Sequence, residues 1–166
     1  MKFSILLANY NNGEYIKEAI NSIITQSYKD WEIVIVDDAS TDKSDEIIKT
    51  YNNDERIKYT INTENKGCGY TKHKCAKLAS GDIFGFLDPD DKLTPNALEV
   101  MVKEHKINLK CSLIFSNRFV CDDKLNPRKN QPEISFDSSK SLLEQSEGQV
   151  SHFVTFKKNI TRKLLA

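Results

Sequence analysis

Short apolar runs alternate with amphipathic stretches along most of the chain. Each apolar run ends in polar turn residues, and several runs are rich in isoleucine and valine, which is typical of strands covered on both faces. Strands are therefore predicted at residues 3–8, 31–36, 57–61, 83–87 and 111–115, with a further strand-like run at 153–156.

Apolar residues at helical spacing predict the connecting segments. Five helices are predicted: one over 14–24, one after the turn at 40–42, one that ends at Ala79, one that begins at Thr94–Pro95, and one near 138–145. Short polar side chains accept hydrogen bonds from the free amides of a first helical turn. Ser40, Thr41 or Asp42 is therefore expected to cap the second helix, and Thr94 the fourth.

This alternation predicts an α/β fold of three layers, with helices on both faces of a mostly parallel, twisted sheet. Ligands in such sheets bind outside the carboxyl ends of the strands. The loops 9–11, 37–38 and 88–91 each follow a predicted strand, so we expect them to converge on one edge. No repeat or linker divides residues 1–166, which are interpreted as a single domain.

Composition narrows the classes of partner. The 166 residues carry 24 basic and 24 acidic side chains, so the chain lacks the broad positive surface of a nucleic-acid binder. No apolar run is long enough for a transmembrane segment or a signal peptide, and we interpret the chain as cytoplasmic. The four cysteines have neither zinc-site spacing nor a secretory context.

Carboxylates cluster after two of the strands. Asp88, Asp90 and Asp91 repel one another unless a cation relieves them, and hard oxygen ligands suit Mg²⁺ or Mn²⁺ bound to a phosphate-bearing substrate. The alternative is a solvated acidic turn before the next helix. Asp37 and Asp38 are likewise either turn formers or acceptors for a ribose or base.

Other candidates are weaker. No glycine-rich phosphate loop follows the first strand, so a diphosphate would depend on the metal. Lys72 could add positive charge, although lysines on a helix commonly form a solvated face. Tyr10 could stack on a base or cover the sheet edge. His73 and His152 have no acid–base partner visible in the sequence.

Four motifs in order resemble those of the family 2 glycosyltransferases of GT-A fold. They are residues 4–11 (SILLANYN), 35–42 (IVDDASTD), 65–67 (NKG) and 86–91 (FLDPDD). The resemblance is strong over residues 1–115 and weaker beyond them. It implies a nucleoside-diphosphate sugar donor, commonly a UDP-sugar, bound with a divalent metal, Mn²⁺ or Mg²⁺.

The resemblance also implies roles for particular residues. Ala8 and Tyr10 would flank the nucleobase, and Asp38 would accept from the base or ribose. Asn65, Gly67 and Lys72 would belong to the donor site. Asp90 and Asp91 would contact the metal, with Asp88 on the ribose or a metal-bound water. The resemblance implies inversion at the sugar carbon and a saccharide or lipid-linked saccharide acceptor, as in bacterial surface polysaccharide synthesis.

The chain departs from the family pattern in two places. Thr71-Lys72-His73 stands where the family usually has Ala-Arg-Asn, so the bidentate fork of arginine is lost. The family's catalytic base, an Asp, is expected beyond Ala166. We therefore expect a fragment with the donor half, which in a longer protein could be associated with a membrane.

Three other functions remain as alternatives. A phospho-receiver domain also joins an acidic strand end to Mg²⁺, but its acidic pair follows the first strand rather than the second. A nucleotidyltransferase usually has a glycine-rich loop and a basic residue after its first strand, which residues 9–13 do not supply. A module that binds nucleotide without turnover is also compatible with the fragment.

Overall fold

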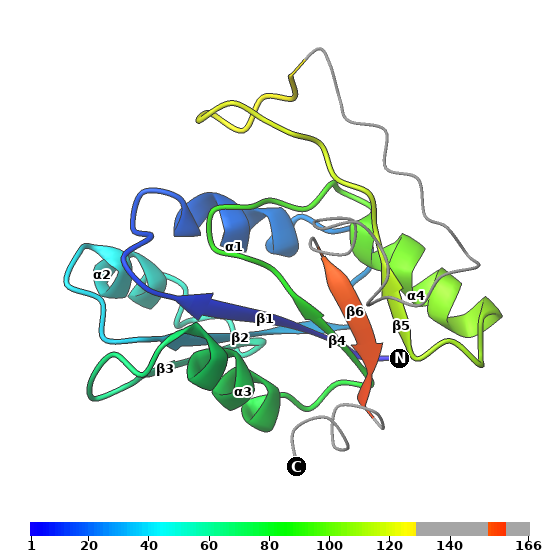
Figure 1. Cartoon of the computed structure of the whole chain (residues 1–166), viewed down its shortest axis with the longest axis horizontal. Helices are drawn as coiled ribbons and strands as arrows, with labels where there is room; N and C mark the ends of the chain where they lie inside the picture. The colour runs from blue at the N-terminus through cyan, green and yellow to red at the C-terminus, as the bar shows by residue number, and fades with distance from the viewer. Residues whose placement is uncertain (129–152, 159–166) are drawn as a thin grey trace.

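The computed structural model describes residues 1–128 and 153–158, which form one six-stranded sheet (Figure 1). The strands lie in the order β3-β2-β1-β4-β6-β5. Their bounds are β1 Phe3–Asn9, β2 Trp31–Asp37, β3 Ile57–Ile61, β4 Ile83–Phe86, β5 Leu113–Phe115 and β6 Val154–Lys157. The first four strands pair in parallel, and β6 lies antiparallel between β4 and β5. The predicted mostly parallel sheet is confirmed.

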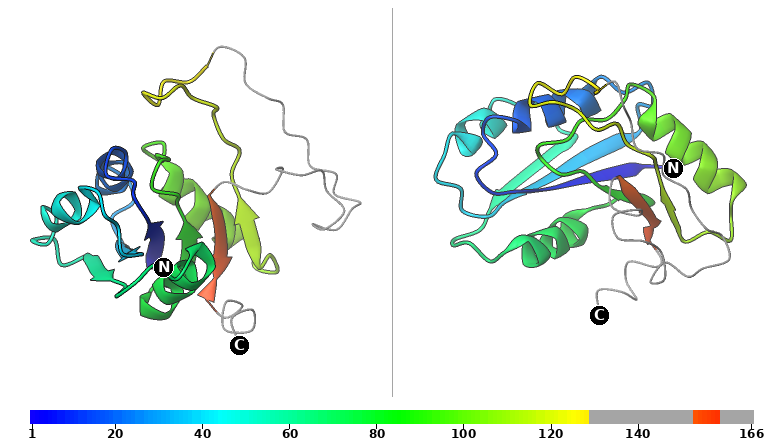
Figure 2. Two further views of the ribbon diagram at one scale, coloured as in Figure 1. Left: turned by 60° about the vertical axis from the view of Figure 1, so that its left-hand side comes forward. Right: turned by 45° about the horizontal axis from the view of Figure 1, so that its top comes forward.

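The helices cover the sheet unequally. Helices α1 (Ile16–Ile24), α2 (Ser44–Lys49) and α4 (Ala97–Ile107) lie on one face, and α3 (Cys68–Leu78) lies on the other (Figures 1 and 2). Alternate residues of β1 point to opposite faces: Ile5 and Leu7 pack in the larger core, while Leu6 packs in the smaller core with Cys75 of α3. The predicted three layers are therefore present.

The predicted helix caps are only partly correct. Helix α2 begins at Ser44 without a side-chain cap, although Asp42 Oδ1 accepts from the Ser44 amide at 2.9 Å. The predicted cap by Thr94 is wrong, because α4 begins at Ala97. Instead, buried Gln26 accepts from the Leu98 amide at 3.0 Å, so a distant side chain satisfies the first turn of α4.

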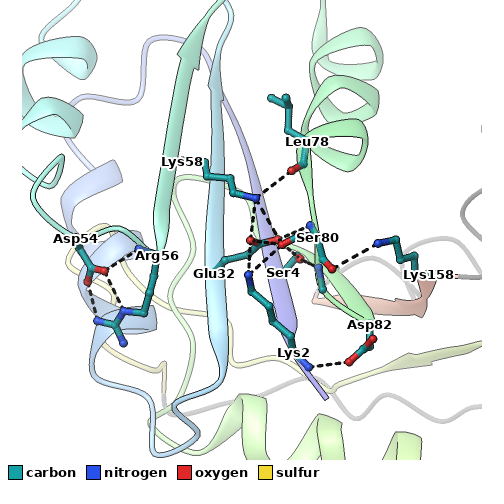
Figure 3. A network of polar contacts seen from close by, with 11 residues as sticks. Lys2, Ser4, Glu32, Asp54, Arg56, Lys58, Leu78, Ser80, Asp82 and Lys158 are labelled. Atoms are coloured by element: carbon teal, nitrogen blue, oxygen red, sulfur yellow. Dashed lines mark hydrogen bonds and ion pairs between the residues drawn. The ribbon is translucent and has the colours of Figure 1, made fainter.

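A buried charge fixes the edge of the sheet where β1 and β2 begin (Figure 3). Glu32 is 1% exposed and lies 2.8 Å from Lys2 Nζ and 3.0 Å from Lys58 Nζ. It also accepts hydrogen bonds from the Ser4 hydroxyl at 2.6 Å and from the Ser80 amide at 2.5 Å. This Glu32 network therefore joins the first three strands to the segment that follows α3.

A second buried group holds β6 against α4. His105 Nε2 lies 2.9 Å from the Thr155 hydroxyl, which donates to the Ile114 carbonyl at 2.8 Å. Nε2 must therefore carry the proton, leaving Nδ1 as a buried acceptor with no hydrogen-bond partner among the described residues. Burial, together with the charge of Lys157, lowers the pKa of His105, so the ring is neutral.

The predicted helix over 138–145 lies outside the described residues, as does His152. All four cysteines carry free thiols. Within residues 1–128 and 153–158, no helix has the length and apolar character needed to cross a membrane.

Candidate functional site

The carboxyl ends of β1, β2 and β3 meet at one edge; the sequence predicted convergence there for the ends of β1 and β2 together with the loop after β4. Asn9 and Asp37 are register partners, and the Asp38 amide donates to the Asn9 carbonyl at 2.8 Å. The backbone amide of Asn62, just after β3, donates to the Asp37 carbonyl at 2.8 Å. Polar residues from three strand ends are therefore held together by backbone hydrogen bonds.

Asp37 forms the turn after β2. Its carboxylate accepts from Asn9 Nδ2 at 2.7 Å, from the Ser40 hydroxyl at 2.6 Å and from the Ser40 amide at 2.8 Å. Ala39, between them, has a φ of 60°, which a non-glycine residue adopts only when its surroundings hold it there. The turn-forming alternative therefore describes Asp37.

Asp38 connects the same strand end to the loop before α3. It is 2% exposed and accepts from Asn62 Nδ2 at 2.7 Å and from the amides of Lys66 at 2.9 Å and Gly67 at 2.8 Å. Burial alone would raise the pKa of Asp38, but these hydrogen bonds, chiefly that from Asn62, outweigh it and lower the pKa. The Thr71 hydroxyl lowers the pKa of Asp38 in the same direction, so the buried carboxylate is held in its ionised form by several donors.

Sequence reasoning missed Asn62. It is buried, accepts from Lys74 Nζ at 2.8 Å and donates to both Asp38 and the Thr71 hydroxyl. Asn62 directly follows β3, so the signal that singled out Asp38, a polar residue at a strand's carboxyl end, could have found it. Asn62 is therefore a positioning residue for Asp38.

Replacing Asn62 with alanine is expected to destabilise the chain by about 2 kcal/mol, because a buried carboxylate loses a donor. Hydrogen exchange at the Lys66 and Gly67 amides should also become faster. Urea unfolding and exchange mass spectrometry measure these effects, with Asn52→Ala as the control because Asn52 is exposed. Equal effects of the two substitutions would contradict the assigned role.

Asn65 and Gly67 shape the loop that binds Asp38. The Gly67 amide also lies 3.0 Å from Asn65 Oδ1, and Gly67 has a φ of 85°, a conformation that favours glycine. The two residues predicted for the donor site therefore lie beside Asp38, where they turn the chain into α3.

The loop after β1 is tied to the loop after β2. Asn11 has a φ of 54°. Its backbone amide donates to the Ser40 hydroxyl oxygen at 2.9 Å, and its side-chain Oδ1 accepts from the Thr41 amide at 2.8 Å. The Gly13 amide donates to Asp42 at 2.7 Å. Tyr10, just before Asn11, is 46% exposed, so its ring is available to a ligand. Ala8, next to the end of β1, is half-buried.

The acidic turn follows β4. The Asp91 amide donates to the Asp88 carbonyl at 3.0 Å, while Asp90 is exposed and Asp88 half-buried. Within residues 1–128 and 153–158, no three His, Cys, Asp or Glu side chains converge on one point as a preformed metal site. Mg²⁺ and Mn²⁺ commonly take only one or two protein carboxylates, so Asp90 and Asp91 remain a suitable donor set.

Lys72 of α3 pairs with this turn. Its Nζ lies 2.9 Å from Asp88 Oδ1 and 5.6 Å from the centre of the Phe86 ring. Burial of Lys72 opposes its charge, but the hydrogen bond and charge of Asp88 outweigh this effect and raise the pKa of Lys72. Lys72 is therefore an ion-paired cation at the site rather than part of a solvated helix face.

This geometry can be compared with known proteins. A model of the family described as glycosyl transferase family 2 matches residues 4–165. The chain belongs to this family. The resemblance read from the four sequence motifs is confirmed, and membership argues against the phospho-receiver and nucleotidyltransferase alternatives.

Relatives from bacteria and archaea share much of this family 2 chain. The putative teichuronic acid biosynthesis glycosyltransferase TuaG of Bacillus subtilis is 35% identical over 114 residues, covering 68% of the chain and 45% of the relative. The uncharacterized glycosyltransferase MJ1057 of Methanocaldococcus jannaschii is 34% identical over 166 residues, covering 97% and 57%. The chain thus spans about half the length of these two relatives.

Solved structures support the GT-A fold. The structure of S. aureus TarS 1-349 in complex with UDP-GlcNAc has a TM-score of 0.80 and 25% identity, covering 99% of this family 2 chain and 47% of the TarS 1-349 chain. The mannosyltransferase PcManGT from Pyrobaculum calidifontis, in complex with GDP-Man and Mn²⁺, has a TM-score of 0.61 and 20% identity. The match covers 67% of this chain and 34% of the mannosyltransferase chain, and it shows the fold alone.

Proposed function

We propose that the chain is the donor-binding part of a glycosyltransferase that moves a sugar from a nucleoside diphosphate, in the first instance UDP, to an acceptor hydroxyl. The observation that carries this proposal is that buried Asp38 and the acidic turn each follow a strand that pairs in parallel with β1, and so lie at the same sheet edge of a family 2 chain. Ligands of open α/β sheets bind at such edges. TarS, with the same fold, is seen with UDP-GlcNAc.

The nucleoside would lie over the ends of β1 and β2. The exposed ring of Tyr10 offers a stacking surface, and Ala8 leaves room beside it. Asp38, held as a carboxylate at this strand end, would accept a hydrogen bond from an N–H or O–H of the base or ribose. Gly67 has no Cβ, and apart from its chain neighbours no atom of the described residues lies within 4 Å of where one would be, so a ligand could approach its backbone closely.

Asp90 and Asp91 would hold a divalent cation, Mn²⁺ or Mg²⁺, with Asp88 on the ribose or a bound water. Asp90 suits this role because it is exposed and accepts no hydrogen bond from any described residue. When bound, such a cation supplies Lewis-acid stabilisation of the leaving diphosphate. Lys72 adds a positive charge near the same phosphates, as a point charge rather than a bidentate fork.

The transfer is proposed to invert the sugar carbon, with the acceptor attacking opposite the leaving diphosphate. Relatives are described by their roles in teichuronic and colanic acid biosynthesis, which supports a saccharide or lipid-linked saccharide acceptor of a bacterial surface polysaccharide. Action on the cytoplasmic side, with membrane association in a longer protein, fits such an acceptor.

Thermal unfolding with UDP, GDP and TDP, each with and without Mn²⁺, tests the donor site. A nucleotide at 100 times its Kd stabilises the native state by about 2.7 kcal/mol, which corresponds to a rise of about 5 °C or more in Tm. We expect this rise with UDP and only when Mn²⁺ is present. No rise with any of the three nucleotides would contradict the proposal. Sugar transfer from the bound donor separates an enzyme from a binding module.

A further inference from the structure

Lys72 stands among the carboxylates as a built-in cation. The side chain is 33% exposed, and its Nζ pairs with Asp88 at 2.9 Å while lying over Phe86. Phe86 is itself fixed by an edge contact with Phe156 of β6, at 6.2 Å between ring centres. The ammonium therefore has two partners from β4 and its turn, and one of them is backed by the sheet.

The position of this ammonium bears on any cation that Asp90 and Asp91 would hold. Asp88 precedes Asp90 by two residues on the same turn, so a dication there would lie near the positive charge of Lys72. The ion pair also takes one Asp88 oxygen away from a ribose or a metal-bound water. Both effects oppose binding of the metal alone.

A nucleoside diphosphate changes this balance. Its phosphates offer Lys72 an alternative anion, and Lys72 can reach one by rotating its flexible stem. If the Lys72 ammonium moved away from Asp88, that carboxylate would become free at the moment when phosphate oxygens arrive to complete a metal's coordination.

We propose that Lys72 keeps divalent metal from the acidic turn until a donor diphosphate draws its ammonium away, so that metal and nucleotide bind together and each binds weakly alone. This inference rests on the proposed function for the identity of the two ligands. Coupling of this kind is reciprocal: the nucleotide raises the affinity for metal by the factor by which metal raises the affinity for nucleotide.

Replacing Lys72 with methionine tests the proposal, because methionine keeps the apolar contact with Phe86 and removes the charge. The affinity for Mn²⁺ alone, measured by electron paramagnetic resonance, is expected to rise about tenfold. The affinity for UDP in saturating Mn²⁺, measured by calorimetry, is expected to fall. Lys72→Arg keeps the charge and should bind Mn²⁺ alone as weakly as the natural chain. Lys77→Met, on the exposed last turn of α3, is the matched control.

Opposite changes in the two affinities separate this role from simple phosphate binding, which predicts only the loss for UDP. Affinity for Mn²⁺ alone that is the same in Lys72→Met and the natural chain overturns the inference. If the natural chain still binds UDP with Mn²⁺, the proposed function survives that result. Tighter Mn²⁺ binding by Lys72→Met, with no nucleotide bound by either protein, supports the built-in cation and contradicts the proposed donor.

Discussion

Replacing Glu32 with alanine is expected to destabilise the chain by about 3 kcal/mol, because it removes the anion from a buried ionic network. The Ser80 amide and the Ser4 hydroxyl lose their acceptor, and Lys2 and Lys58 lose their shared counter-charge. The two lysines are 39% and 44% exposed and can turn to solvent, so the loss lies at the low end for such networks.

Urea unfolding at neutral pH measures this loss. Glu32→Gln keeps an oxygen acceptor of the same shape but no charge, so it should lie between the natural chain and Glu32→Ala. Asp30→Ala is the matched control, because Asp30 is an exposed carboxylate two residues away. A change within about 0.5 kcal/mol for Glu32→Ala would show that the network adds nothing to folding.

The stability of the Glu32 network should also depend on pH. Burial opposes the charge of Glu32, but the hydrogen bonds from Lys2, Ser4 and Ser80 outweigh it and hold the pKa well below its ordinary range. A carboxyl whose folded pKa is depressed stabilises the native state above its unfolded pKa, about 4.3. This contribution is lost as the pH falls from there toward the folded pKa. In Glu32→Gln that part of the acid destabilisation should be missing.

Replacing Asp90 with alanine is expected to weaken Mn²⁺-dependent binding of UDP by about 100-fold or more. Losing even a residue that only orients a metal ligand costs about 10- to 100-fold in affinity, and Asp90 is assigned to the metal itself. The native fold should survive, because Asp90 is exposed and none of the described residues donates to its carboxylate. Calorimetry with and without Mn²⁺ measures the change.

Two further variants sharpen this experiment. Asp90→Asn keeps the size of the side chain and should lose the same binding if the charge is what matters. Glu55→Ala removes an exposed carboxylate just before β3, at the opposite edge of the sheet, and should bind like the natural chain. Affinity retained in Asp90→Ala, at an unchanged urea midpoint, would exclude Asp90 from the metal site.

Much of the fold could be predicted because hydrophobic periodicity is a local property. The strand at 57–61 was predicted with its observed bounds, and the polar ends of β1 and β2 were expected to converge because parallel strands end at one edge. Helix ends were less accurate. Gln26, far along the chain, satisfies the first turn of α4 in place of the predicted Thr94.

The candidate site, too, could be predicted only in part from the sequence. The family resemblance singled out Asp38 and the acidic turn, but the residue pattern alone did not distinguish the turn-forming Asp37 from Asp38, whose hydrogen bonds reach Asn62, Lys66 and Gly67. Lys72 looked like any lysine of a helix surface. Its pairing with Asp88 depends on how α3 packs against the sheet, which no local pattern records.

The sequence by itself determined the order of strands and helices along the chain, and it determined the family, since periodicity and short motifs depend on neighbouring residues. Only the tertiary structure decided which distant side chains meet. It placed β6 between β4 and β5, buried Glu32 among partners from three other segments, and paired Lys72 with Asp88. Such contacts join residues far apart in the chain, and they form because packing and the burial of charge must be satisfied together.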